Sequence, residues 1–334
     1  MRVAALLLVL MSLGCSLQQT VSRQEAVLPW PAFYGQVGPY DVRTAQEIDT
    51  MGADNFRLAL IFYPGNAGPF VQAIRRNNIH YIDSYLWWTI SEVCEPQLLV
   101  NHTCIFSSAD EQQVLAKVRD HLQITSEDAN IVGYWILDDY PGADIHHLLE
   151  SIHGLISDSN ATAIFKRPAI CGFGGRLDWK KERSDVVFLS YYHYFDISLV
   201  NFSPAACDMV ALYPYGVNTI NDPTTIDWSM TTVLPHFLSG LAGRGWNQLQ
   251  QPLIGMPQTF GYAWQNDGQA HFVTPREQDI STQAASYCKA GAVALLPYAW
   301  DDSYTGPKSE LYNSPFMVRG LQQGATDCGK YWYH

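Results

Sequence analysis

Short apolar and aromatic runs recur along the chain, and segments with helical periodicity separate them. The runs are nearly continuous and do not alternate with polar residues, which is typical of parallel strands buried on both faces. Their starts are spaced by roughly 23 to 51 residues, which leaves room for a helix between neighbouring strands. The pattern predicts eight strands, at Phe33–Val37, Phe56–Phe62, His80–Trp87, Ile131–Leu137, Pro168–Phe173, Asp208–Tyr213, Leu253–Gln258 and Ala292–Ala299.

Start signals and apolar stripes predict helices between these strands. Ser108-Ala-Asp-Glu111 has the pattern of a capping box and predicts a helix that runs to Leu122. Apolar residues recur at helical spacing from Ile145 to Ile156. Thr274-Pro275-Arg-Glu277 combines an N-cap residue, a proline at the first helical position and a glutamate that can return to the cap.

Eight alternations of strand and helix predict an α/β fold, a single (β/α)8 TIM barrel over residues 30–334 with a long aromatic connection after strand five. That connection contains the aromatic run 190–196. A doubly wound open sheet is the alternative, but no GxGxxG follows the first strand, as a nucleotide-binding version requires. Gly172-Phe-Gly-Gly175 lacks a following Lys-Ser/Thr, so we expect a loop with positive φ angles there and not a phosphate site.

The first residues have the features of a secretory signal. Arg2 precedes the apolar run Val3–Met11, and small residues stand at the two positions that a signal peptidase reads in Ser12-Leu-Gly14. The apolar run is too short to span a membrane. We therefore expect a signal peptide over residues 1–15, a tether over 16–29 and a secreted protein. Cys15 could instead carry an N-terminal lipid.

Six further cysteines remain after Cys15. An even number in an exported chain suggests disulfides, although six cysteines allow fifteen connectivities. No two of them have CxxC spacing, so zinc binding has little support and we expect no metal and no cofactor. Short separation favours one pair, and the other two would join neighbouring elements of the barrel. The expected pairs are Cys94–Cys104, Cys171–Cys207 and Cys288–Cys328.

Charge and composition narrow the classes of partner. The chain has 334 residues with 20 Lys+Arg and 32 Asp+Glu, which gives a formal net charge of −12. Nucleic acids and anionic membrane surfaces require clustered basic residues, so neither is an expected partner. Aromatic residues make up 13% of the chain, which is a high share for an enzyme domain. We expect a monomer.

Acidic and aromatic residues gather where the predicted strands end, and in a barrel the carboxyl ends of the strands build the active site. Strand four ends in Asp138-Asp139-Tyr140, and strand eight ends in Trp300-Asp301-Asp302. Two adjacent acids directly after a buried run are costly unless they are solvated, paired or used. The other candidates are aromatic or amide side chains: Tyr34, Trp87, Trp88, Tyr213, Tyr215, Gln258, Tyr262 and Trp264.

Carboxylates among flat rings suit carbohydrate chemistry. Sugar rings present apolar faces that pack on aromatic rings, and hydroxyl groups that carboxylates and amides bind. Cleavage of a glycosidic bond needs a protonated acid at the leaving oxygen and a second carboxylate as nucleophile or base. We expect Asp139 to be the acid, with Asp138 orienting it, because adjacent strand residues point to opposite faces.

Three short motifs resemble those of secreted (β/α)8 glycoside hydrolases. Gly133-Tyr-Trp-Ile-Leu-Asp138-Asp139-Tyr-Pro141 is similar to their strand-four motif, which often reads Gly-Tyr-Tyr-Leu-x-Asp-Glu-Pro. Pro257-Gln258-Thr-Phe-Gly261 resembles their strand-seven motif, and Ala299-Trp-Asp-Asp302 resembles their strand-eight ending. The resemblance implies hydrolysis of an extracellular oligo- or polysaccharide by carboxylate acid/base catalysis.

The chain departs from these motifs at both catalytic positions. The family's acid/base glutamate aligns with Asp139, which is one methylene shorter, and no glutamate lies between Gln251 and Arg276. The second carboxylate must therefore come from elsewhere, and Asp301 or Asp302 is the first choice. The main alternative is a non-catalytic carbohydrate-binding barrel that has lost the usual glutamates. Asp301-Asp302 could instead cap a helix, because aspartate is a favoured N-cap residue. Any one of the candidate tryptophans could instead belong to the hydrophobic core.

Overall fold

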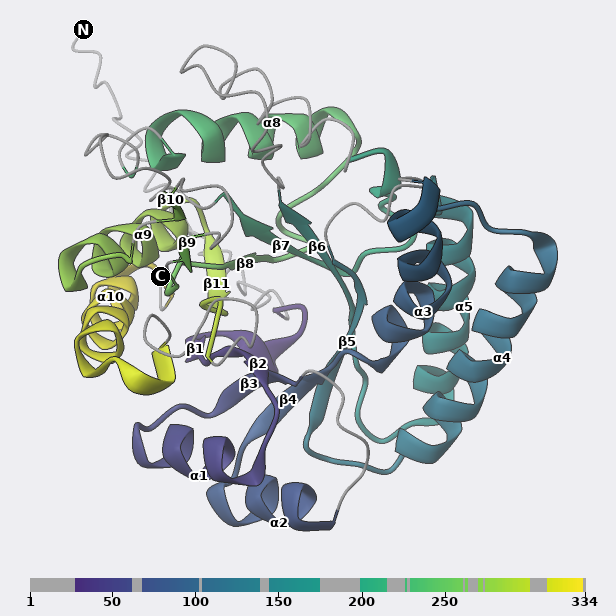
Figure 1. Cartoon of the computed structure of the whole chain (residues 1–334), viewed down its shortest axis with the longest axis horizontal. Coiled ribbons are helices and arrows are strands. Elements are labelled where there is room, and N and C mark those ends of the chain that lie inside the picture. The colour runs from purple at the N-terminus through teal and green to yellow at the C-terminus, as the bar shows by residue number, and fades with distance from the viewer. Residues whose placement is uncertain are drawn as a thin grey trace, which may run out of the picture.

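The structure is a computed structural model in which parallel strands form a central sheet and helices surround it (Figure 1). It describes residues 28–61, 68–101, 104–138, 144–174, 199–214, 226, 229–260, 262–263, 270–272, 274–300 and 311–332. The nine strands of the sheet are β1 (Gln36–Val37), β2 (Tyr40–Val42), β3 (Leu58–Ile61), β4 (His80–Asp83), β5 (Ile131–Leu137), β6 (Ala169–Gly174), β7 (Met209–Tyr213), β8 (Leu253–Gly255) and β11 (Ala292–Leu295).

The first strand closes the sheet into a barrel. The strand order is β1-β11-β8-β7-β6-β5-β4-β3-β2, and every pairing in it is parallel. β1 and β2 stand at the two ends of this order, yet only Gly38 and Pro39 separate them in the chain. The Gly38 N–H donates to Leu295 of β11, and the Pro39 carbonyl accepts from Leu60 of β3. One bent segment therefore joins both edges, and the predicted (β/α)8 barrel is confirmed.

Helices connect successive strands and cover the outside of the barrel (Figure 1). The longer ones are α1 (Ala45–Ala53), α2 (Gly68–Asn77), α3 (Tyr85–Asn101), α4 (Ser108–Thr125), α5 (His146–Thr162), α8 (Leu234–Gly243), α9 (Glu277–Lys289) and α10 (Pro315–Trp332). Short helical turns lie at Pro31–Phe33, Leu199–Asn201, Ser229–Val233 and Leu311–Asn313, and a small antiparallel pair joins β9 (Tyr262–Ala263) to β10 (Ala270–Phe272). In the described part of the chain no helix has the length and apolar character needed to cross a bilayer.

Helices α4 and α9 begin close to the predicted positions, but their N-cap residues differ from the predicted ones. Ser107, one residue before the predicted box, caps α4, and it exchanges hydrogen bonds with Asp110. At α9 the N-cap residue is Arg276, whose backbone and guanidinium both donate to the Asp279 carboxylate, so Thr274 is not the cap. Both starts lie within one or two residues of the predicted ones, which is the usual spread of helix ends.

Several predicted strand boundaries are also wrong. The last two strands end earlier than expected, β8 at Gly255 and β11 at Leu295. The first strand was expected over Phe33–Val37, but Phe33 belongs to a helical turn and the strand resumes after Pro39. The third was expected over His80–Trp87, but β4 ends at Asp83 and α3 begins at Tyr85. Aromatic residues occur in both strands and buried helix starts, so composition alone did not separate the two.

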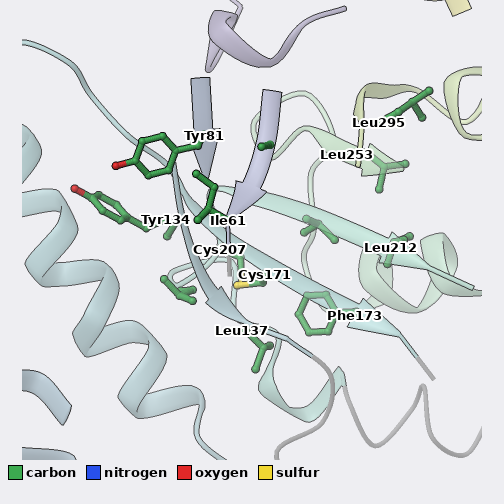
Figure 2. Close-up of a cluster of buried hydrophobic side chains, with 14 of the residues drawn as sticks. Ile61, Tyr81, Tyr134, Leu137, Cys171, Phe173, Cys207, Leu212, Leu253 and Leu295 are labelled. Carbon is green, nitrogen blue, oxygen red and sulfur yellow. A yellow bond between two sulfur atoms is a disulfide. The ribbon is translucent and has the colours of Figure 1, made fainter. Parts of the chain in front are cut away.

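Buried side chains form two clusters, one on each side of the sheet. The inner cluster fills the barrel interior with residues such as Leu60, Ile82, Ile170 and Ile254. The outer cluster lies between the strands and the surrounding helices. Figure 2 shows part of the outer cluster, with Ile61, Leu137, Phe173, Leu212 and Leu253 among its strand residues.

All three predicted disulfides are confirmed. Cys94–Cys104 closes the connection between α3 and α4, and Cys288–Cys328 joins α9 to α10. Cys171–Cys207 ties the middle of β6 to the residues just before β7. Cross-links of this kind restrict the unfolded chain and stabilise the fold by roughly 2–4 kcal/mol each. They are compatible with an extracellular protein.

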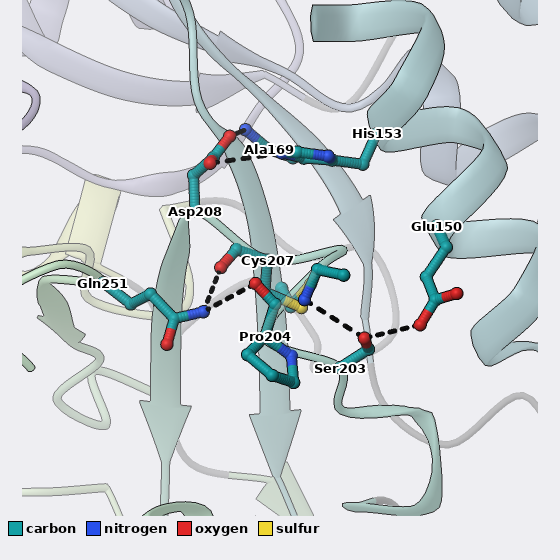
Figure 3. Close-up of a disulfide and its surroundings, with 10 residues drawn as sticks. Glu150, His153, Ala169, Ser203, Pro204, Cys207, Asp208 and Gln251 are labelled. Atoms are coloured by element: carbon teal, nitrogen blue, oxygen red, sulfur yellow. Dashed lines mark hydrogen bonds and ion pairs between the residues drawn. A yellow bond between two sulfur atoms is a disulfide. The ribbon is translucent and has the colours of Figure 1, made fainter. Parts of the chain in front are cut away.

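Polar contacts surround the Cys171–Cys207 disulfide (Figure 3). The Gln251 amide donates to the Cys207 carbonyl at 2.6 Å. Asp208 accepts from the backbone of Ala169 at 2.9 Å, and its other oxygen lies 3.2 Å from Nε2 of His153 on α5. This hydrogen bond raises the pKa of His153 above its ordinary value of 6.5, although partial burial opposes the shift.

The His153–Asp208 pair predicts a pH dependence of stability. Because the folded-state pKa of His153 is raised, its contribution is complete below the unfolded pKa and is lost as the pH rises through the folded value. Denaturant unfolding of the wild type and His153→Gln should differ most below about pH 6, and the difference should shrink by about pH 8. A free-energy difference that stays constant over this range would contradict the assignment.

Candidate functional site

One carboxylate accepts hydrogen bonds across the barrel interior. Asp138 follows β5 directly, and its Oδ1 accepts from the Tyr213 hydroxyl of β7 at 2.8 Å. Its Oδ2 accepts a short hydrogen bond from the Tyr40 hydroxyl of β2. β6 separates β5 from β7, and β3 and β4 separate β5 from β2. The two bonds therefore span the interior, and we call these three residues the Tyr-Asp-Tyr bridge.

A β-bulge in β2 turns Tyr40 inward. Tyr40 pairs with Leu60 and Val42 with Ile61, so two steps on β2 oppose one step on β3 and Asp41 is the extra residue. In a regular strand residues 40 and 42 would face the same side. Here Tyr40 belongs to the inner cluster and Val42 to the outer one.

A second bulge in β5 has the same effect on Asp138. The register of β5 against β6 shifts between Trp135 and Leu137, so Ile136 is the extra residue. Trp135 faces the interior, whereas Ile136 and Leu137 both belong to the outer cluster. The next residue, Asp138, is thereby turned to the inner side, where it meets the two tyrosines.

Two glycines of β6 leave room for the rings beside the bridge. A Cβ atom on Gly172 would lie 2.3 Å from the Trp135 ring, and one on Gly174 would lie 1.8 Å from the Tyr213 ring. Both glycines lie in a regular strand, so the expected loop with positive φ angles is wrong for them. They are needed because aromatic side chains occupy the space that a Cβ would take.

The bridge favours one state of protonation for its members. Burial and, after it, the charge of Asp138 raise the pKa of Tyr40 well above its ordinary value of 10.0. Tyr40 therefore stays protonated and acts as a donor. Hydrogen bonds from two hydroxyl donors favour the ionised form of a carboxyl group.

Aromatic rings surround the bridge. Tyr298 packs edge-on against Tyr40, with ring centroids 5.0 Å apart, and Trp135 contacts Tyr40 from another side at 5.8 Å. Tyr298 also pairs with Gln258 in an isolated parallel bridge, which extends β11 and β8 toward the same end. The Trp135 indole N–H is buried and has no hydrogen-bond partner among the described residues.

The predicted aromatic and amide residues divide between different environments. Gln258 is fully buried, and its amide donates to the carbonyl of Phe260 at 3.0 Å. Trp300 is also fully buried, in the outer cluster against Phe56 and Tyr312. Trp300 therefore lies on the side of the sheet away from the bridge, where it has a packing role.

The strand-one and strand-three candidates lie at opposite ends of the barrel. Tyr34 precedes β1, at the amino end of the first strand, whereas Tyr40 occupies its carboxyl end. Trp87 and Trp88 lie in the first turn of α3 and are both partly exposed. Of these three residues, Trp87 is the one that packs against both the inner and outer clusters.

Asp83, which ends β4, turns outward and not toward the bridge. Its Oδ2 lies 2.9 Å from Nε2 of His121 on α4, and its Oδ1 accepts from the Tyr85 backbone at 2.8 Å. The Tyr85 ring stacks on His121 with centroids 4.1 Å apart. This buried pair anchors α4 to the barrel.

Several predicted site residues lie outside the described residues. For Tyr262 the structure describes only the backbone, as part of β9. In the ranges that the structure does describe, no three His, Cys, Asp or Glu side chains gather closely enough to hold a metal ion. The predicted site residues outside these ranges are Asp139, Tyr140, Tyr215, Trp264, Asp301 and Asp302, and the aromatic run 190–196 lies outside them too.

Comparison with known proteins supports the fold. No family model matches the sequence, and no curated protein matches it. A β-glucuronidase of Ruminococcus gnavus superposes with a TM-score of 0.52 at 8% identity, over 90% of this chain and 50% of that one. A chitinase of Chromobacterium violaceum superposes with a TM-score of 0.51 at 14% identity, over 86% of this chain and 98% of that one. This chain thus spans about half the length of the glucuronidase, and it shares the barrel fold of both structures.

The packing of the Tyr213 ring can be tested at Gly174. Gly174→Ala should lower the free energy of unfolding by about 1–3 kcal/mol, because the new methyl group overlaps the ring. Gly154→Ala is the matched control, since nothing lies within 4 Å of its Cβ position on the exposed face of α5. The control should gain about 0.5–1 kcal/mol. Equal effects of the two substitutions in urea unfolding would disprove the close packing.

Proposed function

We propose that the protein is a glycoside hydrolase that binds its substrate at the carboxyl ends of the barrel strands. The observation that supports this most is the Asp138 carboxyl group, which accepts hydrogen bonds from Tyr40 and Tyr213 across the interior at that end. In barrels this end is where active sites are built. The similar solved structures, a β-glucuronidase and a chitinase, are both glycosidases.

Asp139 is the proposed proton donor. It follows Asp138 in the chain, and a carboxyl group next to an ionised one keeps its proton to higher pH. A protonated acid is what the leaving glycosidic oxygen requires. In this account Asp138 is a positioning residue. Its hydrogen bonds to Tyr40 and Tyr213 favour its ionised form and hold the carboxyl end of β5 in position.

The second carboxylate is proposed to come from Asp301 or Asp302, which follow β11 and Trp300. One of them would attack the sugar directly or remove a proton from the attacking water. Separations of about 5–5.5 Å between the two carboxyl groups give retention of configuration, and about 6.5–9.5 Å give inversion. In either case one water is consumed and both carboxyl groups return to their starting protonation.

Aromatic residues at the same end are the proposed sugar platforms. Trp87, Trp88 and Tyr213 are the described members of this set. Trp87 packs against the inner cluster and Tyr213 belongs to it. Flat faces of this kind bind the apolar side of a sugar ring. Further members of the proposed set are Tyr140, Tyr215, Tyr262 and Trp264.

The proposed setting is outside the cell. A signal peptide over residues 1–15 and a tether over 16–29 would precede the barrel. The three disulfides suit an oxidising compartment. An exported hydrolase with a net charge of −12 would act on a neutral or basic polysaccharide with less repulsion than on an acidic one.

The second candidate function is a carbohydrate-binding barrel without catalysis. The absence of the family's two glutamates from the aligned motifs favours it. The two candidates differ in a measurable way, since both bind sugar but only the enzyme releases products. Calorimetric binding to a glycan with no product in the same sample would favour the binding protein.

Substitution of Asp139 tests the catalytic assignment. Asp139→Asn should lower hydrolysis by about 100-fold or more, because general acid catalysis contributes about 10²–10⁴-fold. The melting temperature should change little. The assay is a panel of polysaccharides with detection of released oligosaccharides by mass spectrometry. Full activity of Asp139→Asn on the substrate that the wild type cleaves would rule out the assignment.

Substitution of Tyr213 tests the bridge separately. Tyr213→Phe removes one donor to a charged acceptor, worth about 1.5–3 kcal/mol, and should lower kcat by about tenfold or more with little change in KM. Tyr81→Phe is the matched control, because Tyr81 donates to Asp128 at 3.0 Å on the outer side of β4. Tyr81→Phe should lose stability but keep kcat. If both variants keep kcat, the bridge has no part in catalysis.

A further inference from the structure

The end of the first strand contains an unusual residue. Asp41 has a φ of 68°, in the left-handed region that non-glycine residues rarely occupy. It is 2% exposed, although it is charged. It is also the extra residue of the β2 bulge and the direct neighbour of Tyr40. Strained backbone conformations of this kind are found most often at functional sites, where they hold a side chain in a particular direction.

We propose that Asp41 is a positioning residue whose left-handed backbone turns Tyr40 toward Asp138. This deepens the proposed function and rests on it, because the bridge is the part of the site that Asp41 would control. Because of the bulge, Tyr40 points to the inner side of the sheet and Val42 to the outer side. A left-handed residue at a bulge is the local device that allows such a change of side.

The Asp41 side chain holds its own backbone in this conformation. Oδ1 accepts from Nε of Arg43 at 2.7 Å, and Oδ2 accepts from Nη2 of the same guanidinium at 2.7 Å. This two-point contact fixes the guanidinium plane relative to the carboxylate. Asp41 and Arg43 are two residues apart, so the contact closes a tight turn around the strained position.

Hydrogen bonds also fix this Asp41–Arg43 turn to helix α1. The Arg43 backbone donates to Oε2 of Glu47 at 2.7 Å, and Thr44 caps the helix by accepting from the Glu47 backbone at 3.2 Å. Glu47 is 5% exposed. The bulge therefore has a rigid support on its C-terminal side, so that its geometry is set before any substrate binds.

The support on the other side is the barrel wall. The Tyr40 backbone N–H donates to Pro297 at 3.0 Å, and its carbonyl accepts from Trp300 at 2.9 Å. Both partners follow β11. These two bonds hold the Tyr40 backbone with its side chain inward, and the bulge at Asp41 lets the chain keep them while Val42 turns to the outer side.

Substitutions of Asp41 by alanine and by glycine distinguish the effect of its backbone conformation from the effect of its side-chain contact. Asp41→Ala loses the Arg43 contact and disfavours a positive φ, whereas Asp41→Gly loses the contact but permits the conformation. Crystal structures of both variants should show the Tyr40–Asp138 hydrogen bond broken in Asp41→Ala and kept in Asp41→Gly. Where the wild type has a substrate, kcat should fall about tenfold or more in the alanine variant and less than about threefold in the glycine variant.

Asn55 provides the matched control, since its φ is 64° in the turn between α1 and β3, at the opposite end of the barrel. Asn55→Ala should lower the melting temperature and leave the Tyr40–Asp138 bond and kcat unchanged. The proposal is overturned if Asp41→Ala keeps both the bond and kcat, or if Asp41→Gly loses the bond. Should Asp41→Ala fail to fold, the glycine variant alone still decides. If the wild type cleaves no glycan, the proposed hydrolase function is wrong. The crystal structures of the two variants would still test whether Asp41 positions Tyr40.

Discussion

The hydrogen bonds from Tyr40 and Tyr213 to Asp138 are the interaction on which the candidate site depends. They join three strands that are not neighbours in the sheet, so they fix the carboxyl ends of the barrel relative to one another. They also supply hydrogen bonds to a carboxyl group in a largely apolar interior, where a polar group without partners is costly. The rest of the site follows from accommodating this bridge. Gly172 and Gly174 make room for the rings beside it.

Two β-bulges and one bent strand create the bridge without disturbing the barrel. A regular (β/α)8 barrel fills its interior with alternating side chains, and here the interior residues of β3, β4, β6 and β8 follow that rule. The register shifts in β2 and β5 stand directly beside Tyr40 and Asp138, and further shifts lie between β4 and β5 and between β8 and β11. Tyr40 and Asp138 meet at the carboxyl ends of the strands, whereas the apolar side chain of Phe33 packs at the amino ends.

Much of this fold was predictable from the sequence, because buried parallel strands are continuous apolar runs that alternate with helical stripes. The three disulfides followed from the same layout. Tyr40 was not predictable, because Gly38-Pro39 interrupts the first strand and a bulge leaves no mark in the residue types. The same limit explains Trp300, which was expected at the site and is buried in the outer cluster. Asp138 was expected only to orient its neighbour, and its inward direction depends on the extra residue Ile136.

The most direct test of the account is the position of a bound sugar. A crystal structure of the wild type with a non-hydrolysed oligosaccharide, chosen from the glycans it binds, would give that position. The account predicts a sugar ring over the Tyr-Asp-Tyr bridge, with the glycosidic oxygen within about 3 Å of the Asp139 carboxyl group. A sugar bound at the amino ends of the strands, or on the outer helices, would contradict it.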